Sequence, residues 1–312
     1  MWNSGVSFNP DKDIPSLAGK VILVTGGNTG LGLETIFQLA KHDPAHIYLA
    51  ARSEEKGNQA VKDVLDKVPN APPVTFIRLD LGSLASIKAA AASFRASSDR
   101  LDILINNAGI MAVPEGLTED GYEIQFGTNH LGHALLVKLL LPTLKATAAT
   151  SSSDVRVVSL SSIGERMAPK DSYHLDKAKT TMPHLNTWTR YAQSKLANVH
   201  YSAALAKHNS DIKFISVHPG MVNTTLGDTF MYGFGSVVGK VLKLLSNVLS
   251  VTVENGALNQ LWAATSQDAE SGVFYHPVGV TGKGSLLSNN EEVRDQLWEW
   301  TEKELEPYTA DM

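Results

Sequence analysis

The sequence predicts an α/β protein in which one doubly wound parallel sheet is flanked by helices. Two observations predict this fold: six short runs rich in Val, Ile and Leu recur along the chain, and a helical pattern separates each run from the next. Strands that are nearly all apolar are typical of a sheet covered on both faces. Their alternation with helices indicates parallel strands joined by right-handed crossovers.

The expected elements follow one another without an obvious linker. Strands are expected at residues 20–25, 46–51, 74–79, 101–105, 155–160 and 212–217, and helices at residues 31–41, 54–68, 84–95, 128–146 and 188–207. An amphipathic pattern around residues 297–300 indicates a closing helix. We therefore expect a single domain over residues 1–312, with its core at about 18–280 and a C-terminal tail at about 285–312.

Composition excludes several classes of protein. The chain has 312 residues and no cysteine, which rules out a disulfide framework, a thiolate nucleophile and a cysteine-bound metal site. Its net charge of −5 provides no basic field, so we expect no nucleic-acid partner. The sequence contains no run of about 18 apolar residues and no signal-peptide pattern, so we expect a cytoplasmic protein without a transmembrane segment.

A glycine-rich turn joins the first expected strand to the first expected helix. Gly26, Gly30 and Gly32 would let the chain turn tightly, bring its backbone close to a pyrophosphate and pack the helix against the sheet. The first N–H groups of that helix would then hold phosphate oxygens. A purely structural strand-to-helix connection is the alternative, which the position after the first strand disfavours. The other residues expected to bind a cofactor here are Asn28, Thr29 and Leu31.

The residue that follows the second strand distinguishes two dinucleotide cofactors. An NAD site usually has Asp or Glu there, whereas Arg accommodates the 2′-phosphate of NADP. Arg52 occupies this position with no acidic residue before it, and its planar guanidinium can bind a phosphate through paired hydrogen bonds. We therefore expect NADP(H). A solvated arginine at the start of a helix is the alternative.

Further cofactor contacts are expected after the third and fourth strands. Asp80 would accept a hydrogen bond from an adenine amino group or else cap the helix that begins after Gly82. Small residues after the fourth strand leave room for a ligand in the crevice of the sheet. The residues expected to bind the cofactor here are Asp80, Leu81, Asn107, Ala108 and Gly109.

Reactive side chains are expected on the helix at residues 188–207. Tyr191 and Lys195 are four residues apart and so share one helix face. A cation about 4 Å from a phenol is worth roughly 4 kcal/mol at an effective dielectric near 20, which would lower the phenol pKa by around three units at most. That change would make Tyr191 a general acid and base. Because most such pairs are ordinary helix surface, the interpretation depends on the surrounding residues.

Three further groups are expected at the same edge of the sheet. Ser162 ends the fifth strand, with Ser161 as the alternative hydroxyl. Asn129 lies near the start of the helix after the fourth strand. A Pro-Gly turn follows the sixth strand, and a simple turn without function is its alternative interpretation. The cofactor contacts expected in this turn are Pro219, Gly220, Val222 and Thr224.

In this order, the motifs resemble those of the short-chain dehydrogenase/reductase family over roughly residues 18–280. The resemblance is carried by residues 25–32, 106–109 and 219–224 together with Asn129, Ser162, Tyr191 and Lys195. Within the family, residues 25–30 and 191–198 are similar to retinol-dehydrogenase-like and fungal members. The resemblance implies a Rossmann-type fold and an oxidoreductase.

The resemblance also implies a role for each matching residue. Tyr191 would protonate the carbonyl oxygen during reduction, and Lys195 would lower the pKa of Tyr191 and hold the nicotinamide ribose. Ser162 would polarise the substrate oxygen, and Asn129 would anchor a proton-relay water near Lys195. The residues implied to contact the ribose or the carboxamide are Asn107, Val222 and Thr224.

The chain departs from compact members of the family in two places. The segment between Ser162 and Tyr191 is long, and we expect its His174 and His184 to be solvent-exposed loop residues and not metal ligands. Residues 230–253 are apolar at helical spacing, and the family resemblance implies a helical lid over about residues 224–253, which suggests a hydrophobic ketone, aldehyde or alcohol as substrate. Peripheral contact with a membrane surface is the alternative role for this segment.

These observations favour an NADP-dependent carbonyl reductase or alcohol dehydrogenase that acts on a hydrophobic small molecule, with Tyr191 as general acid and base. The alternative is a protein that senses NADP(H) without turnover, which the presence of Ser162, Tyr191 and Lys195 disfavours. The resemblance also implies a homodimer or homotetramer that pairs through the helices at residues 128–146 and 188–207. The side chains expected at that interface, or alternatively in the core, are Leu131, Leu135, Leu139, Tyr201 and Leu205.

Overall fold

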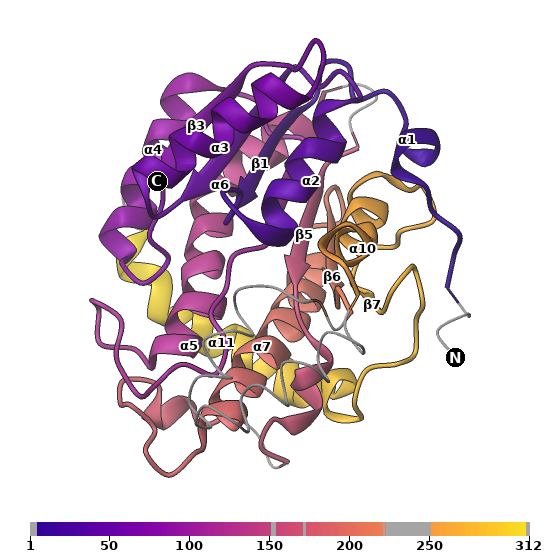
Figure 1. Cartoon of the computed structure of the whole chain (residues 1–312). Helices are drawn as coiled ribbons and strands as arrows, with labels where there is room; N and C mark the ends of the chain where they lie inside the picture. The colour runs from indigo at the N-terminus through magenta and orange to yellow at the C-terminus, as the bar shows by residue number, and fades with distance from the viewer. Residues whose placement is uncertain (1–4, 151–153, 171–172, 221, 223–250, 310–312) are drawn as a thin grey trace, which may run out of the picture.

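Seven strands form one sheet in the order β3-β2-β1-β4-β5-β6-β7 (Figure 1). The computed structural model describes residues 5–150, 154–170, 173–220, 222 and 251–309. Every pair of neighbouring strands is parallel. Strand order reverses between β1 and β4, and open α/β sheets bind ligands at the carboxyl ends of the strands at such a point. The expected fold class is confirmed.

Six of the strands were predicted from sequence to within two residues at each end. They are β1 (Val21–Thr25), β2 (His46–Ala51), β3 (Val74–Arg78), β4 (Ile103–Asn106), β5 (Arg156–Leu160) and β6 (Lys213–Val217). The seventh strand, β7 (Phe274–Tyr275), is not predicted by the sequence pattern. Two residues are too few to show either alternation or an apolar run.

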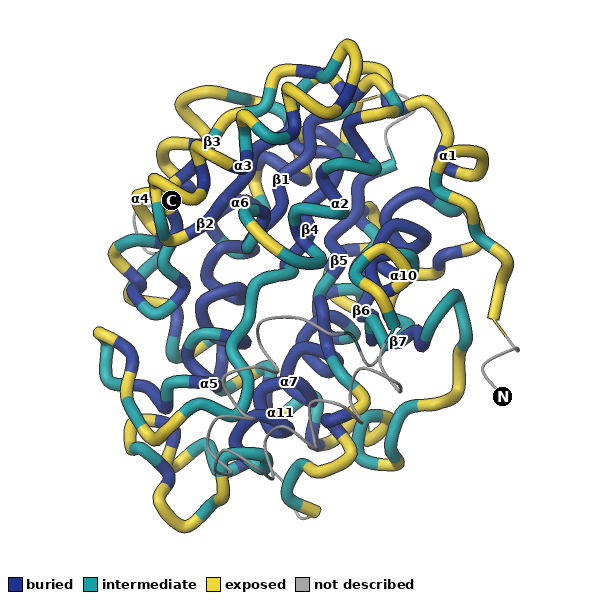
Figure 2. The backbone as a smooth tube through the Cα atoms, in the orientation of Figure 1, coloured by how far each residue is buried: buried dark blue, intermediate teal, exposed yellow. Residues whose placement is uncertain are grey.

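Helices cover both faces of the sheet (Figures 1 and 2). One face carries α2 (Gly30–Ala40), α3 (Glu54–Lys67) and α10 (Val253–Thr265), and the other carries α4 (Leu84–Ser97), α6 (Gly132–Ala148) and α7 (Thr187–His208). Neighbouring residues of a strand point to opposite cores, so Ile22 packs with α2 and α10 whereas Leu23 packs with α4 and α6. The short remaining elements are α1 (Pro10–Asp13), α5 (Ile124–Phe126), the π-helical turn η1 (Gly127–Leu131), and the 3₁₀ turns η2 (Ile163–Met167), η3 (Leu175–Lys177), η5 (Leu287–Asn289) and η6 (Glu306–Tyr308).

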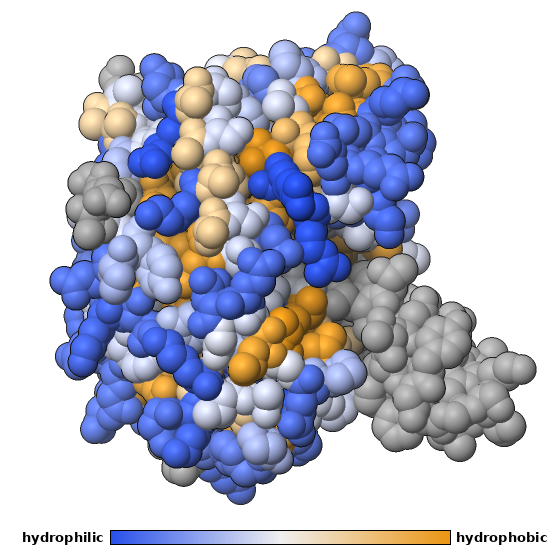
Figure 3. Space-filling model, turned by 90° about the vertical axis from the view of Figure 1, so that its left-hand side faces the viewer, coloured by the Kyte–Doolittle hydropathy of each residue, from blue (hydrophilic) through white to orange (hydrophobic). Residues whose placement is uncertain are grey.

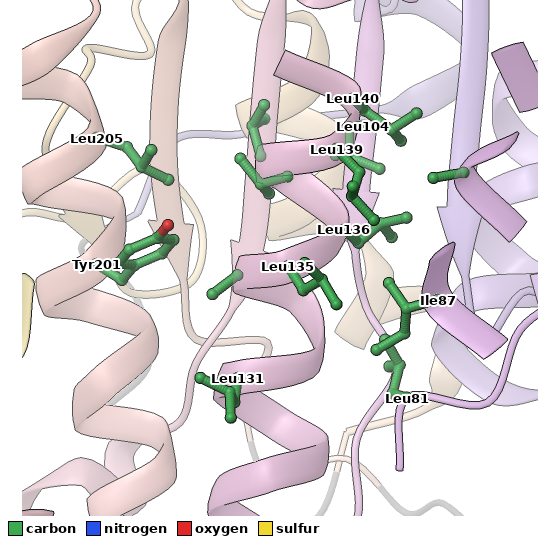
Figure 4. Close-up of a cluster of buried hydrophobic side chains, with 14 of the residues drawn as sticks. Leu81, Ile87, Leu104, Leu131, Leu135, Leu136, Leu139, Leu140, Tyr201 and Leu205 are labelled. Carbon is green, nitrogen blue, oxygen red and sulfur yellow. The ribbon is translucent and has the colours of Figure 1, made fainter. Parts of the chain in front are cut away.

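The predicted closing helix is α11 (Glu291–Leu305), which packs on α7 and reaches the turn η1 that precedes α6. The Tyr201 hydroxyl donates to Glu302 at 3.1 Å, and a hydrogen bond of 3.0 Å joins His130 Nε2 to Thr301 Oγ1. The apolar side chains of α6 and α7 therefore lie inside the chain (Figure 4). Of the two interpretations of these side chains, the structure supports the core for all five, namely Leu131, Leu135, Leu139, Tyr201 and Leu205.

One helical stretch in the described part of the chain, Ile124–Ala148, has the length and composition to cross a membrane. Of its most apolar window, 67% is buried inside the protein. Figure 4 shows Leu131, Leu135 and Leu139 of this stretch among the buried side chains beside the strands. These features are those of a helix in a protein core.

The segment expected to form a lid, residues 224–253, lies outside the described residues except at 251–253. Thr224, an expected cofactor contact, is among the residues outside. At the two ends of this gap, Val222 pairs with Val251 in a parallel bridge, and Val253 begins α10.

The surface contrasts with the two cores. Figure 3 shows one face on which hydrophilic residues predominate and hydrophobic residues form small separate patches. Large hydrophobic side chains that are exposed in the described part of the chain include Leu65, Leu117, Ile163, Met167 and Leu286. Scattered exposure of this kind is ordinary for a protein surface in contact with water.

Buried histidines make the fold sensitive to acid. Burial lowers the pKa of His130 to about 3 and that of His200 to about 4, from an ordinary value of 6.5. Between about pH 4 and 6.5 the unfolded chain therefore binds more protons than the folded protein, so the free energy of unfolding falls as the pH falls through this range. We expect each of the two histidines to cost about 2 kcal/mol of stability at pH 5.

Denaturant titrations at pH 7, 6 and 5 measure this loss of stability. A His130→Gln variant should show a weaker dependence on pH than the wild type, because glutamine does not titrate. Equal free energies of unfolding at pH 7 and pH 5 in the wild type would contradict the prediction.

Candidate active site

The ends of β1 and β4 are tied together at the carboxyl edge of the sheet, where strand order reverses (both strands are labelled in Figure 2). Thr25 Oγ1 accepts hydrogen bonds from the N–H groups of Asn107 and Ala108, both at 3.0 Å. Asn107 Nδ2 donates to the carbonyl oxygen of Thr25 at 2.8 Å. The segment after β4 is thus fixed against the glycine-rich turn, which begins one residue after Thr25.

Glycine is required in that turn for two reasons. Gly26 and Gly30 have φ values of +64° and +53°, in the left-handed region that favours glycine. A Cβ on Gly32 would lie 2.4 Å from the carbonyl oxygen of Gly26 and 2.6 Å from Asn107 Nδ2. Gly32 therefore allows α2 to approach both the turn and the segment after β4.

The first turn of α2 has backbone N–H groups that no capping side chain satisfies. Its N-cap, Thr29, makes no side-chain hydrogen bond to the helix, whereas the N-cap side chains of α3, α4, α7, α10 and α11 each accept one. Unpaired N–H groups and the positive end of the helix dipole favour an anion. The turn therefore fits the pyrophosphate of a dinucleotide, and Asn28 and Leu31 lie within it.

Arg52 follows β2 at the same edge and is exposed. Among the residues that the structure describes, its guanidinium has no hydrogen-bond or ion-pair partner, and the side chain that caps α3 is that of Ser53. A phosphate bound at this edge could therefore use all of the donors of Arg52.

Asp80 and Leu81 follow β3 and differ in what they offer a ligand. Asp80 Oδ1 accepts a hydrogen bond from the N–H of Gly82 at 2.9 Å, and the N-cap of α4 is Ser83. The helix-cap alternative for Asp80 is therefore wrong, because the Ser83 hydroxyl satisfies the helix instead. The Leu81 side chain is buried in the core, which leaves its backbone for any contact with a cofactor.

The Ser162 hydroxyl lies beside the Tyr191 phenol beyond the end of β5, close enough to act on its pKa. Gly164 lies against both, since a Cβ there would be 3.1 Å from Tyr191 Cε1 and 3.2 Å from Ser162 Oγ. The Ser161 hydroxyl points elsewhere and donates to the carbonyl oxygen of Lys195 at 2.7 Å. Of the two serines left open by the sequence, the structure brings Ser162 to Tyr191.

Lys195 extends from α7 toward the end of β5. Its Nζ donates to the carbonyl oxygen of Leu160 at 3.0 Å and lies 5.9 Å from the centroid of the Tyr191 ring. Burial lowers the pKa of Lys195 to about 8. Burial raises the pKa of Tyr191 above its ordinary value of 10, and the Ser162 hydrogen bond acts in the opposite direction.

These values correct the expectation that Lys195 brings the pKa of Tyr191 toward neutrality. The expected effect on the pKa required an ammonium about 4 Å from the phenol, but the Lys195 side chain instead reaches the carbonyl of Leu160. Desolvation of the phenol is the larger effect on its pKa. Tyr191 is therefore protonated at neutral pH, and Lys195 is mostly charged.

Asn129 lies in the π-helical turn η1, in which the N–H of Gly132 donates to the carbonyl oxygen of Gly127. Its side chain is held at both ends: Oδ1 accepts from the N–H of Ile110 at 2.8 Å, and Nδ2 donates to the Ile110 carbonyl and to Ser194 Oγ, both at 2.9 Å. Turns of this type often occur at functional sites.

Gly109 separates Asn129 from Lys195. A Cβ on Gly109 would lie 3.1 Å from Asn129 Oδ1 and 3.3 Å from Lys195 Nζ. Because Gly109 has no side chain, both polar atoms border the same space beside the segment after β4. The small residues after β4 predict such a space.

The turn after β6 completes the described part of this edge. Pro219 and Gly220 are half-buried, and Gly220 has φ +93°. The side chains of Val222 and Leu31 both pack against Gly256 of α10. A Cβ on Gly256 would lie 2.5 Å from Val222 Cγ2 and 2.8 Å from Leu31 Cδ2. Two residues predicted from distant motifs therefore lie together.

His174 and His184 also lie together, in the long segment before α7. His184 Nε2 and His174 Nδ1 are 3.3 Å apart, which corresponds to a hydrogen bond between the two imidazoles. In the described ranges, no group of three or more His, Asp or Glu side chains is arranged to hold a metal ion.

Three buried polar residues contribute to the site although the sequence analysis names none of them as a site residue: His133, Asn198 and Gln260. Asn198 Nδ2 donates to the same carbonyl oxygen as Lys195, at 3.0 Å. His133 and Asn198 each lie one helical turn after a predicted site residue, and this spacing could have identified them. Gln260 lies on α10, a helix that the sequence analysis did not predict.

Relatives of known sequence point to one family. The family model described as short chain dehydrogenase matches residues 20–173. An uncharacterized oxidoreductase of Schizosaccharomyces pombe is 38% identical over 93% of this chain and 86% of its own length. Human retinol dehydrogenase 13 is 41% identical over 68% of this chain and 62% of its own length.

Solved structures share the fold. An uncharacterized protein of Mycobacterium paratuberculosis has a TM-score of 0.73 at 29% identity and covers 96% of this chain and 97% of its own. NADPH-bound carbonyl reductase from chicken fatty liver has a TM-score of 0.62 at 26% identity, covering 85% of this chain and 99% of its own. A 3-ketoacyl-(acyl-carrier-protein) reductase of Brucella melitensis complexed with NADH has a TM-score of 0.62 at 19% identity, covering 85% and 98%, and shares the fold alone.

The Gly32→Ala variant tests the close packing of the glycine-rich turn. The added methyl group would meet the backbone oxygen of Gly26 at 2.4 Å, so the turn must shift. We expect a loss of roughly 1–3 kcal/mol of stability and weaker binding of dinucleotide. Thermal unfolding and titration of NADPH fluorescence measure the two effects.

Gly116→Ala is the matched control, because its nearest neighbour lies at an ordinary 3.8 Å. This variant should behave like the wild type. If Gly32→Ala bound NADPH as tightly as the control, the turn would not be the pyrophosphate site.

Proposed function

The chain belongs to the short-chain dehydrogenase/reductase family of oxidoreductases, and on this basis we propose that it is an NADP(H)-dependent carbonyl reductase or alcohol dehydrogenase for hydrophobic small molecules. The observation that carries the proposal is the arrangement of Ser162, Tyr191 and Lys195 beside the crevice between β1 and β4. The glycine-rich turn lies at the same edge, so a cofactor and a substrate oxygen would meet there.

The residues of this edge fit NADP(H) in distinct ways. When bound, NADPH would supply a hydride. The uncapped start of α2 would bind the pyrophosphate, and the exposed guanidinium of Arg52 would bind the 2′-phosphate. The residues that would contact the rest of the cofactor are Asp80, Leu81, Asn107, Ala108, Gly109, Tyr191, Lys195, Pro219, Gly220, Val222 and Thr224.

Tyr191 would act as the general acid in carbonyl reduction. Its raised pKa keeps the phenol protonated at neutral pH, which is the form that can donate a proton to the substrate oxygen. Ser162, which lies beside Tyr191, would orient and polarise the same oxygen. In alcohol oxidation the proton would pass in the reverse direction.

Lys195 would stabilise the phenolate that forms when Tyr191 gives up its proton. With a pKa of about 8, its ammonium is charged at neutral pH although it is buried. The ammonium donates a hydrogen bond to the Leu160 carbonyl oxygen at 3.0 Å. Lys195 lies on the same face of α7 as Tyr191. Asn129 lies across Gly109 from Lys195 and would hold a water for proton relay.

Side chains beside Tyr191 support a hydrophobic substrate. Trp188 lies one helical turn before Tyr191, with its ring edge-on to the phenol at a centroid distance of 6.5 Å. Ile110, Met111 and Val113 follow β4 at the same edge and are half-buried. A ketone, aldehyde or alcohol with an apolar body would bury these surfaces on binding.

Tyr191→Phe tests the mechanism. We expect this variant to bind NADPH like the wild type and to lose about 100- to 10,000-fold in turnover, because it lacks the proton donor. NADPH oxidation against a panel of hydrophobic ketones, aldehydes and quinones, followed by absorbance, measures turnover. Tyr201→Phe is the matched control, since this buried tyrosine on the same helix hydrogen-bonds to Glu302.

Equal turnover in Tyr191→Phe and the wild type would rule out Tyr191 as the acid. NADPH binding by the wild type with no turnover across the panel would instead support a cofactor-sensing protein.

Arg52→Asp tests the cofactor preference. We expect the ratio of kcat/KM for NADPH to that for NADH to fall at least about tenfold, because a charge-assisted contact with the 2′-phosphate is replaced by repulsion. Arg95→Asp is the control, since this exposed arginine lies in the last turn of α4, at the opposite edge of the sheet. An unchanged ratio would mean that Arg52 does not contact the cofactor.

A further inference from the structure

A buried histidine on α6 bridges the cofactor edge and Asn129. His133 is 5% exposed, with Nε2 2.9 Å from Thr25 Oγ1 and Nδ1 3.0 Å from the carbonyl oxygen of Asn129. Thr25 and Asn129 are completely buried. Both imidazole nitrogens are therefore used inside the protein.

The chemistry of the partners fixes the direction of each hydrogen bond. The carbonyl oxygen of Asn129 can only accept, so His133 Nδ1 carries a proton. Burial lowers the pKa of His133 to about 4, so the ring is neutral at pH 7 and Nε2 is an acceptor. The Thr25 hydroxyl then donates to His133 Nε2 at 2.9 Å in preference to its other acceptor, the Ile105 carbonyl oxygen, which lies at 3.4 Å.

The same hydroxyl oxygen accepts from two backbone N–H groups. Those of Asn107 and Ala108 both lie 3.0 Å from Thr25 Oγ1. The hydroxyl thus uses its one donor and both acceptor positions. A charged His133 could not replace the neutral ring, because its second N–H would compete for an oxygen that already accepts two hydrogen bonds.

Beyond Asn129 the hydrogen bonds continue to the catalytic helix. Asn129 Nδ2 donates to Ser194 Oγ at 2.9 Å, and the Ser194 hydroxyl donates to the carbonyl oxygen of Tyr191 at 2.7 Å. A buried path of hydrogen bonds therefore runs from the end of β1, through His133, to the backbone of Tyr191.

We propose that His133 is a positioning residue, which sets Asn129 and the Tyr191 helix relative to the cofactor-binding edge through hydrogen bonds on both of its nitrogens. This inference rests on the proposed oxidoreductase function. A histidine suits the task because the rigid neutral ring donates on one side and accepts on the other. A buried group with only one of these properties would leave either Thr25 or Asn129 without its partner.

The hydrogen-bond directions can be tested without turnover. In ¹⁵N-labelled protein, the imidazole resonances that are absent from His133→Phe belong to His133, and we expect them to show the Nδ1–H tautomer at pH 7. Thr25→Ser should preserve this tautomer pattern and the chemical shift of Nε2, whereas Thr25→Val should move the Nε2 shift. An Nε2–H tautomer, or no difference between the two threonine variants, would overturn the proposal.

Kinetics test the positioning role. We expect His133→Phe and Thr25→Val each to lower kcat per folded molecule about 10- to 100-fold, because small displacements of catalytic groups are costly. NADPH should also bind more weakly in both variants, and Thr25→Ser should stay close to the wild type. A role in stability alone would lower the unfolding temperature and leave kcat per folded molecule unchanged, which would contradict the proposal.

The double variant Thr25→Val/His133→Phe should be no worse than the poorer single variant, because both changes break one path. Additive losses would overturn the shared path. If His133→Phe does not fold, the imidazole resonances that move in Thr25→Val and not in Thr25→Ser identify His133, and the same pair of variants gives the kinetic result. A wild type with the expected tautomer but no turnover would refute the proposed function, whereas turnover that persists in Thr25→Val would refute the role of His133.

Discussion

The hydrogen bonds that join Thr25 to Asn107 and Ala108 are the constraint on which the site depends. β1 and β4 are neighbours in the sheet, but the chain leaves them toward helices on opposite faces, which opens a crevice between their ends. Backbone N–H groups at that point have left the strand ladder and need other partners. The buried hydroxyl of Thr25 accepts hydrogen bonds from two of these N–H groups. The glycine-rich turn, Gly109 and Asn129 surround these hydrogen bonds at the bottom of the crevice.

Much of the fold could be predicted because regular elements impose a pattern on the sequence. Strands covered on both faces must be apolar throughout, and the turn after β1 excludes side chains at Gly26, Gly30 and Gly32. Helix α10 was not predicted because its buried face includes polar residues. Asn259 donates to two backbone carbonyls at the ends of β6 and β7, and Gln260 donates to α2, so buried positions do not appear apolar in the sequence.

The site was predictable in its residue types but not in its detailed geometry. Order along the chain places Ser161 and Ser162 at the same edge, but β5 ends at Leu160, and strand alternation no longer tells which hydroxyl faces Tyr191. The spacing of Tyr191 and Lys195 gives a shared helix face and leaves the flexible lysine free to reach a carbonyl on β5. Such choices depend on contacts between distant segments, for which one sequence contains no periodic signal.

Burial acts on the charges of Tyr191 and Lys195 in a way that suits a transient phenolate. Desolvation raises the pKa of the phenol and so disfavours the resting anion. The ammonium of Lys195 lies 5.9 Å from the centroid of the phenol ring, and a positive charge attracts a phenolate more strongly than a neutral phenol. The neutral phenol gains little from this charge, so the stabilisation grows as the proton leaves Tyr191. An interaction that is stronger in the transition state than in the resting state is the kind that accelerates a reaction.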